Sequence, residues 1–346
     1  MVATPSSLRL QVCAAVCALA ACACPQQLAA QDPSRITAEL MARHVRALAD
    51  DSMRGRATPS PEVEKAAGYV AAAFARAGLD PAGDSGAYIQ RYTVGRDTAA
   101  ASRRTAPNVV GLLRGRDPAL SGEFVAVVAH MDHVGVAGRD RSCSALGADS
   151  VCNGADDNAS GTAGVLALAE AFAAQTVRPR RSILFLTVSG EERGLLGSRA
   201  FVARPSVPLD SLVALVNLDM IGRNRPDSVY LNGWGKSTIS DLVRELAVQH
   251  GELGLAVGPD EEDRPQTPGD SDHFPFQRQG VPYVFFYTGG HPDYHAPGDE
   301  PARLDADKAA RVARLAFFAM WEMAERAGRP KWDPAARRLN VVARKQ

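Results

Sequence analysis

Imidazole and carboxylate side chains gather in this sequence where apolar runs end. Three such runs have the length and composition of strands buried on both faces of a sheet: residues 124–129, 183–188 and 212–218. The polar residues that directly follow them are His130, Asp132 and His133, then Glu191 and Glu192, then Asp219. Because ligands bind beyond the carboxyl ends of the strands in an open α/β sheet, these side chains are expected to share one site.

Two more polar segments belong with them. Residues 154–161 carry Asp156 and Asp157 just before a helix, and residues 289–295 follow the last apolar run. Taken singly, an Asp-Asp-Asn stretch is usually a helix N-cap. A His-x-Asp pair is usually either exposed at the surface or satisfied by its own hydrogen bonds. Taken together, so many carboxylates beside buried strands would be costly unless a metal ion neutralised them.

The ligand types indicate which metal. A set of imidazole and carboxylate ligands that contains no cysteine thiolate is typical of catalytic zinc. More carboxylates than one ion needs favour a site for two metal ions, with one carboxylate between them. A structural calcium or magnesium site would use mostly oxygen ligands, so the histidines argue against it.

The elements that position these residues alternate between strand and helix from about residue 107. Short strands are also expected near 229–231 and 283–287, and helices near 40–48, 160–174, 237–250 and 305–327. A further helix is predicted from Pro61, with Ser60 as its N-cap and Gly78 just past its end. The pattern predicts an α/β three-layer sandwich with a central, largely parallel mixed sheet flanked by helices.

Composition excludes several classes of protein. The 346 residues carry 39 basic and 39 acidic side chains, so no net charge is available to attract nucleic acid or an anionic membrane. With 46% hydrophobic residues, the chain has neither the composition of a disordered protein nor that of a multi-span membrane protein. No repeat or low-complexity linker is visible, and residues 31–346 are expected to form a single catalytic domain.

The amino terminus is expected to be a leader. Arg9 precedes an apolar run at residues 10–24, which is shorter than the roughly 20 residues that cross a membrane, so residues 1–30 are predicted to be a signal peptide. Cleavage near Ala30 and lipidation at Cys22, which ends a lipoprotein-like Leu-Ala-Ala-Cys box, are both open. The protein is therefore expected to be exported, as a periplasmic or extracellular enzyme or as an outer-membrane lipoprotein.

The cysteines outside the leader predict a disulfide. Of the six cysteines, only Cys143 and Cys152 lie beyond residue 30. Both stand in a Ser-, Gly- and Asp-containing segment that is typical of a surface loop. An even pair in an exported chain favours a disulfide over two unpaired core thiols.

The motifs resemble those of metallopeptidase family 28, which contains secreted two-zinc aminopeptidases. The resemblance covers about residues 108–300, in the family's order, and rests on His130-x-Asp132, Gly154-Ala155-Asp156-Asp157-Asn158-Ala159-Ser160-Gly161, Gly190-Glu191-Glu192, Asn217-Leu218-Asp219-Met220 and Tyr294-His295. It implies an exported, zinc-dependent exopeptidase that acts on peptides, most simply an aminopeptidase.

Carried over by position, the resemblance implies a role for each site residue. The implied ligands of two Zn²⁺ ions are Asp157 as the bridge, His130 and Asp219 on one ion, and Glu192 and His295 on the other. Glu191 is the implied general base. Asp132 would orient the imidazole of His130, and the peptide bond after Asp157 is expected to be cis.

Two substrate contacts are expected at neighbouring positions. Tyr294, beside His295, is the candidate donor to the oxyanion that develops during attack. Some relatives place a tyrosine three residues before the Ser-Asp-His turn instead, where this chain has Pro268. Arg223, four residues after Asp219, is a candidate for holding the substrate backbone, with a solvated loop arginine as the competing interpretation.

Other functions occur on the same framework. Carboxypeptidases, dipeptidases and glutaminyl cyclases share the metal ligands, so the ligands do not separate them from aminopeptidases. A cyclase is disfavoured because ligands for two ions are present. A non-enzymatic, receptor-like domain is disfavoured because neither a ligand nor the base is lost.

Overall fold

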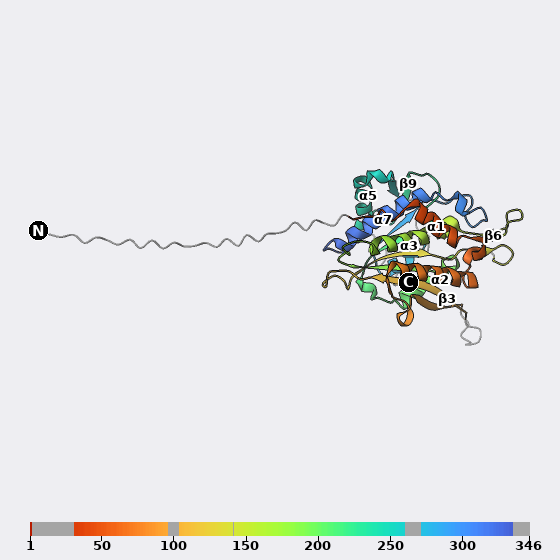
Figure 1. The fold of residues 1–346 in the computed structure, drawn as a ribbon, viewed down its shortest axis with the longest axis horizontal. Helices are drawn as coiled ribbons and strands as arrows, with labels where there is room; N and C mark the ends of the chain where they lie inside the picture. The colour runs from red at the N-terminus through yellow and green to blue at the C-terminus, as the bar shows by residue number, and fades with distance from the viewer. Residues whose placement is uncertain (2–30, 96–103, 141, 260–270, 335–346) are drawn as a thin grey trace. The chain divides into compact units, whose positions relative to one another are not determined.

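The computed structural model describes residue 1 and residues 31–95, 104–140, 142–259 and 271–334. From Gln31 onward the described residues form one compact unit around a mixed sheet (Figure 1). Among these residues, nine strands make the sheet, in the order β1-β3-β7-β4-β8-β11-β9-β10 with β2 paired to β3, and β5 and β6 form a separate hairpin. The strands are β1 (Asp80–Pro81), β2 (Ile89–Val94), β3 (Arg104–Leu113), β4 (Phe124–His130), β5 (Gly135–Val136), β6 (Val151–Cys152), β7 (Ser182–Val188), β8 (Leu212–Leu218), β9 (Ser228–Asn232), β10 (Ala256–Pro259) and β11 (Tyr283–Tyr287).

The central strands β7, β4, β8 and β11 run parallel to one another. Their carboxyl ends therefore lie at one edge of the sheet, where the polar side chains were expected to converge. β3 and β9 border this set and are antiparallel to β7 and β11. The largely parallel, mixed α/β sheet is confirmed, whereas β1, β2, β3 and β10 had no counterpart among the strand ranges that were expected.

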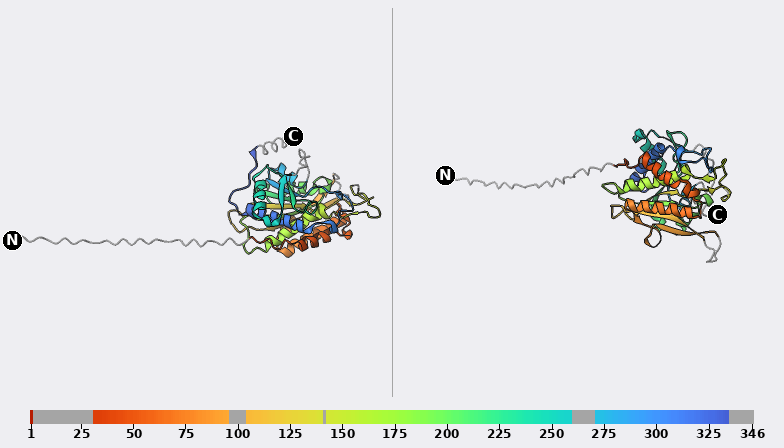
Figure 2. Two further views of the ribbon diagram at one scale, coloured as in Figure 1. Left: turned by 90° about the horizontal axis from the view of Figure 1, so that it is seen from above. Right: turned by 45° about the vertical axis from the view of Figure 1, so that its right-hand side comes forward.

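Helices cover both faces of the sheet. Along β4, Val125 and Val127 belong to the core beneath α1, α2, α3, α5 and α7, whereas Ala126 and Val128 belong to the core beneath α4 and α6. Figure 2 shows the two helical layers on either side of the strands. Burial of both faces explains why β4 is apolar throughout. The helices are α1 (Ala38–Leu48), α2 (Pro61–Ala77), α3 (Gly161–Ala173), α4 (Leu196–Ala203), α5 (Thr238–Gln249), α6 (His273–Arg278) and α7 (Ala306–Glu325).

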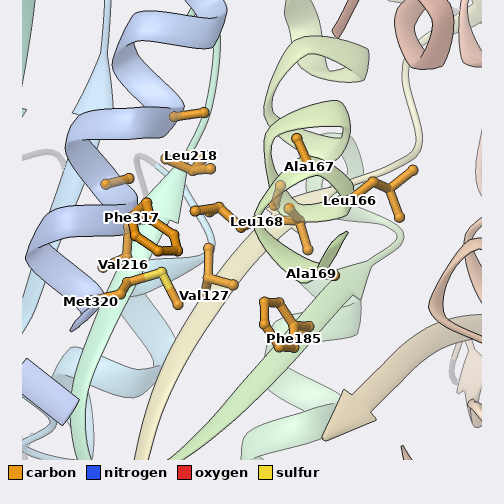
Figure 3. Packing of buried hydrophobic residues seen from close by; sticks show 14 of the residues in the cluster. Val127, Leu166, Ala167, Leu168, Ala169, Phe185, Val216, Leu218, Phe317 and Met320 are labelled. Carbon is orange, nitrogen blue, oxygen red and sulfur yellow. The ribbon is translucent and has the colours of Figure 1, made fainter. Parts of the chain in front are cut away.

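The larger core fixes α3, the helix that begins just after the Asp157 segment. Figure 3 shows Leu168 of α3 and Phe317 of α7 close to Val127 and Val216 of the sheet, and all four side chains are fully buried. Full burial of one large apolar side chain contributes about 1.5–3 kcal/mol. The start of α3 is therefore held firmly against the carboxyl edge of the sheet.

The structure confirms the residues that were predicted to begin and end α2. Ser60 Oγ accepts the N–H groups of Glu62 and Val63, Pro61 is the first helical residue, and Gly78 ends the helix with a φ of 78°. That left-handed conformation is easily adopted by glycine.

Neither α2 nor any other helix in the described part of the chain is long and apolar enough to cross a membrane.

Candidate metal centre

The predicted ligands come from separate turns at the carboxyl edge of the sheet. They are His130, the last residue of β4; Asp219, just after β8; Glu192, in the turn η4 (Glu191–Arg193) after β7; His295, in the loop after β11; and Asp157, in the π-helical turn η3 (Ala155–Ser160) before α3. The peptide bond between Asp157 and Asn158 is cis, as the resemblance implied. The fold thus brings together residues that lie up to 165 positions apart.

Asp157 presents its two oxygens to two different groups. Oδ1 lies 3.4 Å from His130 Nε2, which is also 3.3 Å from Asp219 Oδ1. Oδ2 lies 3.3 Å from His295 Nε2, which is also 3.0 Å from Glu192 Oε2. This is the arrangement expected of a carboxylate that lies between two ions.

These side chains fit bound metal. Asp157 Oδ2, Asp219 Oδ1 and His295 Nε2 are buried atoms without a hydrogen-bond partner among the described residues. Such atoms cost free energy unless another interaction compensates them. Tetrahedral zinc with bonds of about 2.0–2.1 Å would hold its ligand atoms about 3.3 Å apart, close to the separations in both groups.

Asp132 lies fully buried between two of the ligand-bearing segments. Its Oδ1 is 3.7 Å from His130 Nδ1. The same carboxylate accepts the backbone N–H of Gly190 at 2.7 Å and that of Glu191 at 3.4 Å. Burial raises the pKa of Asp132 to about 6. The backbone oxygen of Asp132 lies closer to the same His130 Nδ1, at 3.2 Å, so main chain and carboxylate both contact the imidazole, and the carboxylate also holds the turn that carries Glu191.

Glu191 lies beside the same atoms. One of its oxygens lies within 4.8 Å of a His130 nitrogen and of a Glu192 oxygen. Burial raises the pKa of Glu191 well above its usual value, with a further rise from Glu192 and Asp272 that the nearby His130 opposes. A carboxyl group with a raised pKa can accept and release a proton close to neutral pH.

Tyr294 lies at the solvent side of the centre. It is 51% exposed, and its ring stacks on the His295 imidazole with 3.8 Å between the ring centroids. A substrate approaching the ligands would meet this ring, but donation to an oxyanion stays a prediction. The alternative position at Pro268 lies outside the described residues.

Arg223 has an environment that neither sequence interpretation described. Its side chain is 13% exposed, with Nη2 2.6 Å from Asp293 Oδ2 and Nη1 3.6 Å from Asp299 Oδ1. Two carboxylates therefore hold the guanidinium, so it is not a solvated loop arginine. Its contact with a substrate backbone stays a prediction.

Two residues without a predicted role hold ligands in place. The carboxylate of Asp299, which is fully buried, accepts the N–H groups of Asp156 and Asp157 at 3.0 Å. Ser271 donates its Oγ–H to Asp219 Oδ2 at 2.7 Å. Ser271 belongs to the Ser-Asp-His turn at residues 271–273, whereas nothing in the local sequence distinguishes Asp299 from any loop aspartate.

His133 follows the end of β4 and received no role from the sequence. Its Nδ1 lies 3.0 Å from Glu192 Oε1 and 3.6 Å from Asp157 Oδ2. Together with His295, these residues form a group whose ligand atoms all lie within 4.8 Å of one another. The signal that could have identified it is its position, three residues after His130 at the same strand end.

A disulfide and a buried arginine anchor the surrounding segments. Cys143 and Cys152 are joined by an S–S bond of 2.07 Å, which confirms the predicted disulfide. Cys152 Sγ lies 3.5 Å from the backbone oxygen of His295. Arg56 is fully buried and donates to three carbonyl groups that flank the ligand segments, those of Met131, Asn153 and Gly154.

Proteins of similar sequence include peptidases. Aminopeptidase YwaD of Bacillus subtilis is 26% identical over 261 residues, which are 72% of this chain and 51% of YwaD. A probable leucine aminopeptidase of Trichophyton verrucosum is 28% identical over 221 residues, which are 60% of this chain and 56% of the fungal protein. The chain thus spans about half the length of these curated relatives.

Solved structures share the fold, and a family profile matches the sequence. The aminopeptidase from Aneurinibacillus sp. strain AM-1 superposes with a TM-score of 0.65 at 18% identity, over 88% of this chain and 98% of that one. A Porphyromonas gingivalis glutaminyl cyclase superposes with a TM-score of 0.60 at 17% identity, over 84% and 99%. The profile of peptidase family M28 matches residues 108–320, more than half of the chain and all five predicted ligands. The chain therefore belongs to peptidase family M28.

Proposed function

We propose that this protein is a metallo-aminopeptidase that removes N-terminal residues from peptides at a centre of two zinc ions. The observation that carries the proposal is Asp157, whose two oxygens face separate groups of ligands. Membership of a peptidase family supports peptides as substrates. The names of the relatives, which are aminopeptidases, support action at the amino end.

Each ion would have its own set of protein ligands. His130, Asp157 and Asp219 would hold one ion, and Asp157, Glu192 and His295 the other. When bound, such ions polarise a substrate carbonyl and lower the pKa of a water. Glu191, which lies beside His130 and Glu192, would take a proton from the attacking water and deliver it to the leaving amine.

The acidic surroundings favour a substrate with a free amino terminus. A protonated α-amino group needs nearby negative charge, and the Glu191 carboxylate would supply it beside the proposed ligands. Tyr294, exposed next to His295, would donate to the developing oxyanion. Arg223 would contact the substrate backbone only after exchanging one of its carboxylate partners.

A second candidate function is glutaminyl cyclisation, because a glutaminyl cyclase shares the fold. The two sets of ligands around Asp157 favour the peptidase, since each set can hold an ion of its own. A carboxypeptidase or dipeptidase would use the same ligands. These functions differ in which end of the substrate must be free.

Matched peptides separate the candidates. One tripeptide is offered with both termini free, with an acetylated amino end, and with an amidated carboxyl end. An aminopeptidase should lose several orders of magnitude in kcat/KM on acetylation and little on amidation, whereas the reverse order would indicate a carboxypeptidase. A peptide that begins with glutamine should lose the whole residue, and release of ammonia instead would indicate a cyclase.

We also propose that residues 1–30 are a leader removed on export, with lipidation at Cys22 as the alternative. These residues, apart from Met1, lie outside the described part of the chain. The Cys143–Cys152 disulfide supports an oxidising compartment. The intact mass of the protein from its native cells tests this: a shortened chain supports cleavage, a lipid on Cys22 supports the anchor, and a full-length chain contradicts both.

A further inference from the structure

His133 faces the centre from the loop after β4. We propose that its Nδ1 binds the same ion as Asp157, Glu192 and His295, so that this ion has four protein ligands and the other has three. The inference rests on the metal centre of the proposed function. It adds a ligand that neither the motif nor the family resemblance supplied.

The distances around His133 match those around the neighbouring ligand His295. His133 Nδ1 lies 3.0 Å from Glu192 Oε1 and 3.6 Å from Asp157 Oδ2. His295 Nε2 lies 3.3 Å from the same Asp157 oxygen and 3.0 Å from the other Glu192 oxygen. Because ligands of tetrahedral zinc are separated by about 3.3 Å, both imidazoles have the spacing of ligands to one ion.

The His133 ring is fixed in this orientation. The residue is 1% exposed, and its ring meets that of His295 edge-on, with 5.5 Å between centroids and 76° between planes. Gly154 has a φ of 59°, and a Cβ at that position would lie 2.4 Å from His133 Cγ. A glycine is therefore needed both for the left-handed backbone and for the close approach of the imidazole.

A hydrogen bond from His133 Nδ1–H to Glu192 is the alternative explanation. It would account for the 3.0 Å separation, and Asp157, Glu192 and His295 would still hold the ion as three ligands. A ligand to the same ion, unlike a donor to Glu192 alone, also accounts for the 3.6 Å approach of His133 Nδ1 to Asp157 Oδ2. His133 Nε2 has no hydrogen-bond partner in the described structure with either explanation, so it does not distinguish them.

The two ions would then differ in coordination. Four protein ligands close a tetrahedral zinc site, whereas three leave one position open. The ion held by His130, Asp157 and Asp219 is therefore the one with an open position, and Glu191 lies within 4.8 Å of His130 and of Glu192. The site that includes His133 should bind its ion first.

Proton NMR of the protein titrated with Co²⁺ tests this directly. Each imidazole bound to Co²⁺ gives a strongly shifted ring N–H signal that disappears in D₂O. Added to the metal-free full chain, the first equivalent should give two such signals, from His133 and His295, and the second should add one from His130. His133→Asn should reduce the first step to one signal, while His250→Asn, at the end of α5, should leave all three.

The wild-type signal count decides the question even if His133→Asn does not fold. One signal in the first step, or a pattern that His133→Asn does not change, would overturn the proposal. A chain that binds a single Co²⁺ would contradict the two-ion centre of the proposed function. In that case two signals from the single ion would still support His133 as a ligand, and one signal would exclude it.

Discussion

Gly190 donates its backbone N–H to Asp132 Oδ2 at 2.7 Å, which joins the turn after β7 to the end of β4. The other oxygen of the same carboxylate is 3.7 Å from His130 Nδ1 and accepts the Glu191 N–H at 3.4 Å. One buried side chain thus bonds to the turn that carries the proposed base and lies near the imidazole of a proposed metal ligand, which the Asp132 backbone oxygen also contacts at 3.2 Å. A change at Asp132 should disturb metal binding and turnover together.

Asp132→Asn tests this relationship. The substitution removes an acceptor from the Gly190 N–H and weakens the orientation of His130, so zinc affinity should fall about 10- to 100-fold. The kcat should also fall at saturating zinc, because the turn that carries Glu191 shifts. Zinc affinity measured by competition with a chelator, and kcat in excess zinc, check the two effects. Asp241→Asn, on the exposed side of α5, is the matched control. Equal zinc affinity in both variants would show that Asp132 does not support zinc binding.

Glu191→Gln and Glu192→Gln separate the proposed base from the neighbouring ligand. Glu191→Gln deletes a proton acceptor but no predicted ligand, so it should keep both ions and lose nearly all turnover. Glu192→Gln should instead lower the zinc content, because a ligand oxygen is replaced. Zinc per chain and turnover are measured on the same samples. If Glu191→Gln kept most of the wild-type rate with unchanged zinc, the assignment of the base would be wrong.

Asp299→Asn tests how Asp157, the proposed bridging residue, is held. Asp299 accepts the backbone N–H groups of Asp156 and Asp157, and an amide in its place puts a donor where an acceptor is needed. Zinc affinity should fall about tenfold or more while the fold, followed by circular dichroism, is kept. Asp293→Asn, which also removes a carboxylate from Arg223 but contacts no ligand, is the control. An equal loss of zinc affinity in both variants would show that Asp299 acts only through Arg223, and no loss in Asp299→Asn would contradict its role.

The buried imidazole of His273 should make the folded protein less stable as the pH falls. Burial lowers its pKa to about 3, whereas a histidine in an unfolded chain titrates near 6.5. Between these values the unfolded chain binds more protons than the folded one, so the free energy of unfolding should fall as the pH falls, by up to roughly 1.4 kcal/mol per pH unit. His273→Phe, which keeps the stacking on Tyr283, should flatten this dependence in urea unfolding between pH 7 and 5. A slope equal to that of the wild type would contradict the buried neutral imidazole.

The strand ends could be predicted because their signal is local. Residues 124–130 and 212–218 are apolar without interruption, which requires burial on both faces, and the polar residues directly after them must lie at the carboxyl edge. Ser60 and Gly78 marked the ends of α2 for an equally local reason, since a hydroxyl cap and a left-handed glycine act within one turn.

The supporting contacts could not be predicted because they join distant parts of the chain. Asp299 bonds to the N–H of a residue 142 positions earlier, and His133 meets a carboxylate 59 positions later. No local pattern encodes such pairs. β2 alternates in burial and pairs antiparallel with β3 at the side of the sheet, so its place also depends on the finished tertiary structure.

The zinc requirement of peptide hydrolysis tests the central claim most directly. Metal-free protein is titrated with Zn²⁺ while the hydrolysis of a peptide with a free amino terminus is followed. A two-zinc centre bridged by Asp157 predicts no turnover without zinc, a plateau at two zinc ions per chain, and loss of both zinc binding and turnover in Asp157→Asn. Hydrolysis by the metal-free protein, or full activity in Asp157→Asn, would contradict it.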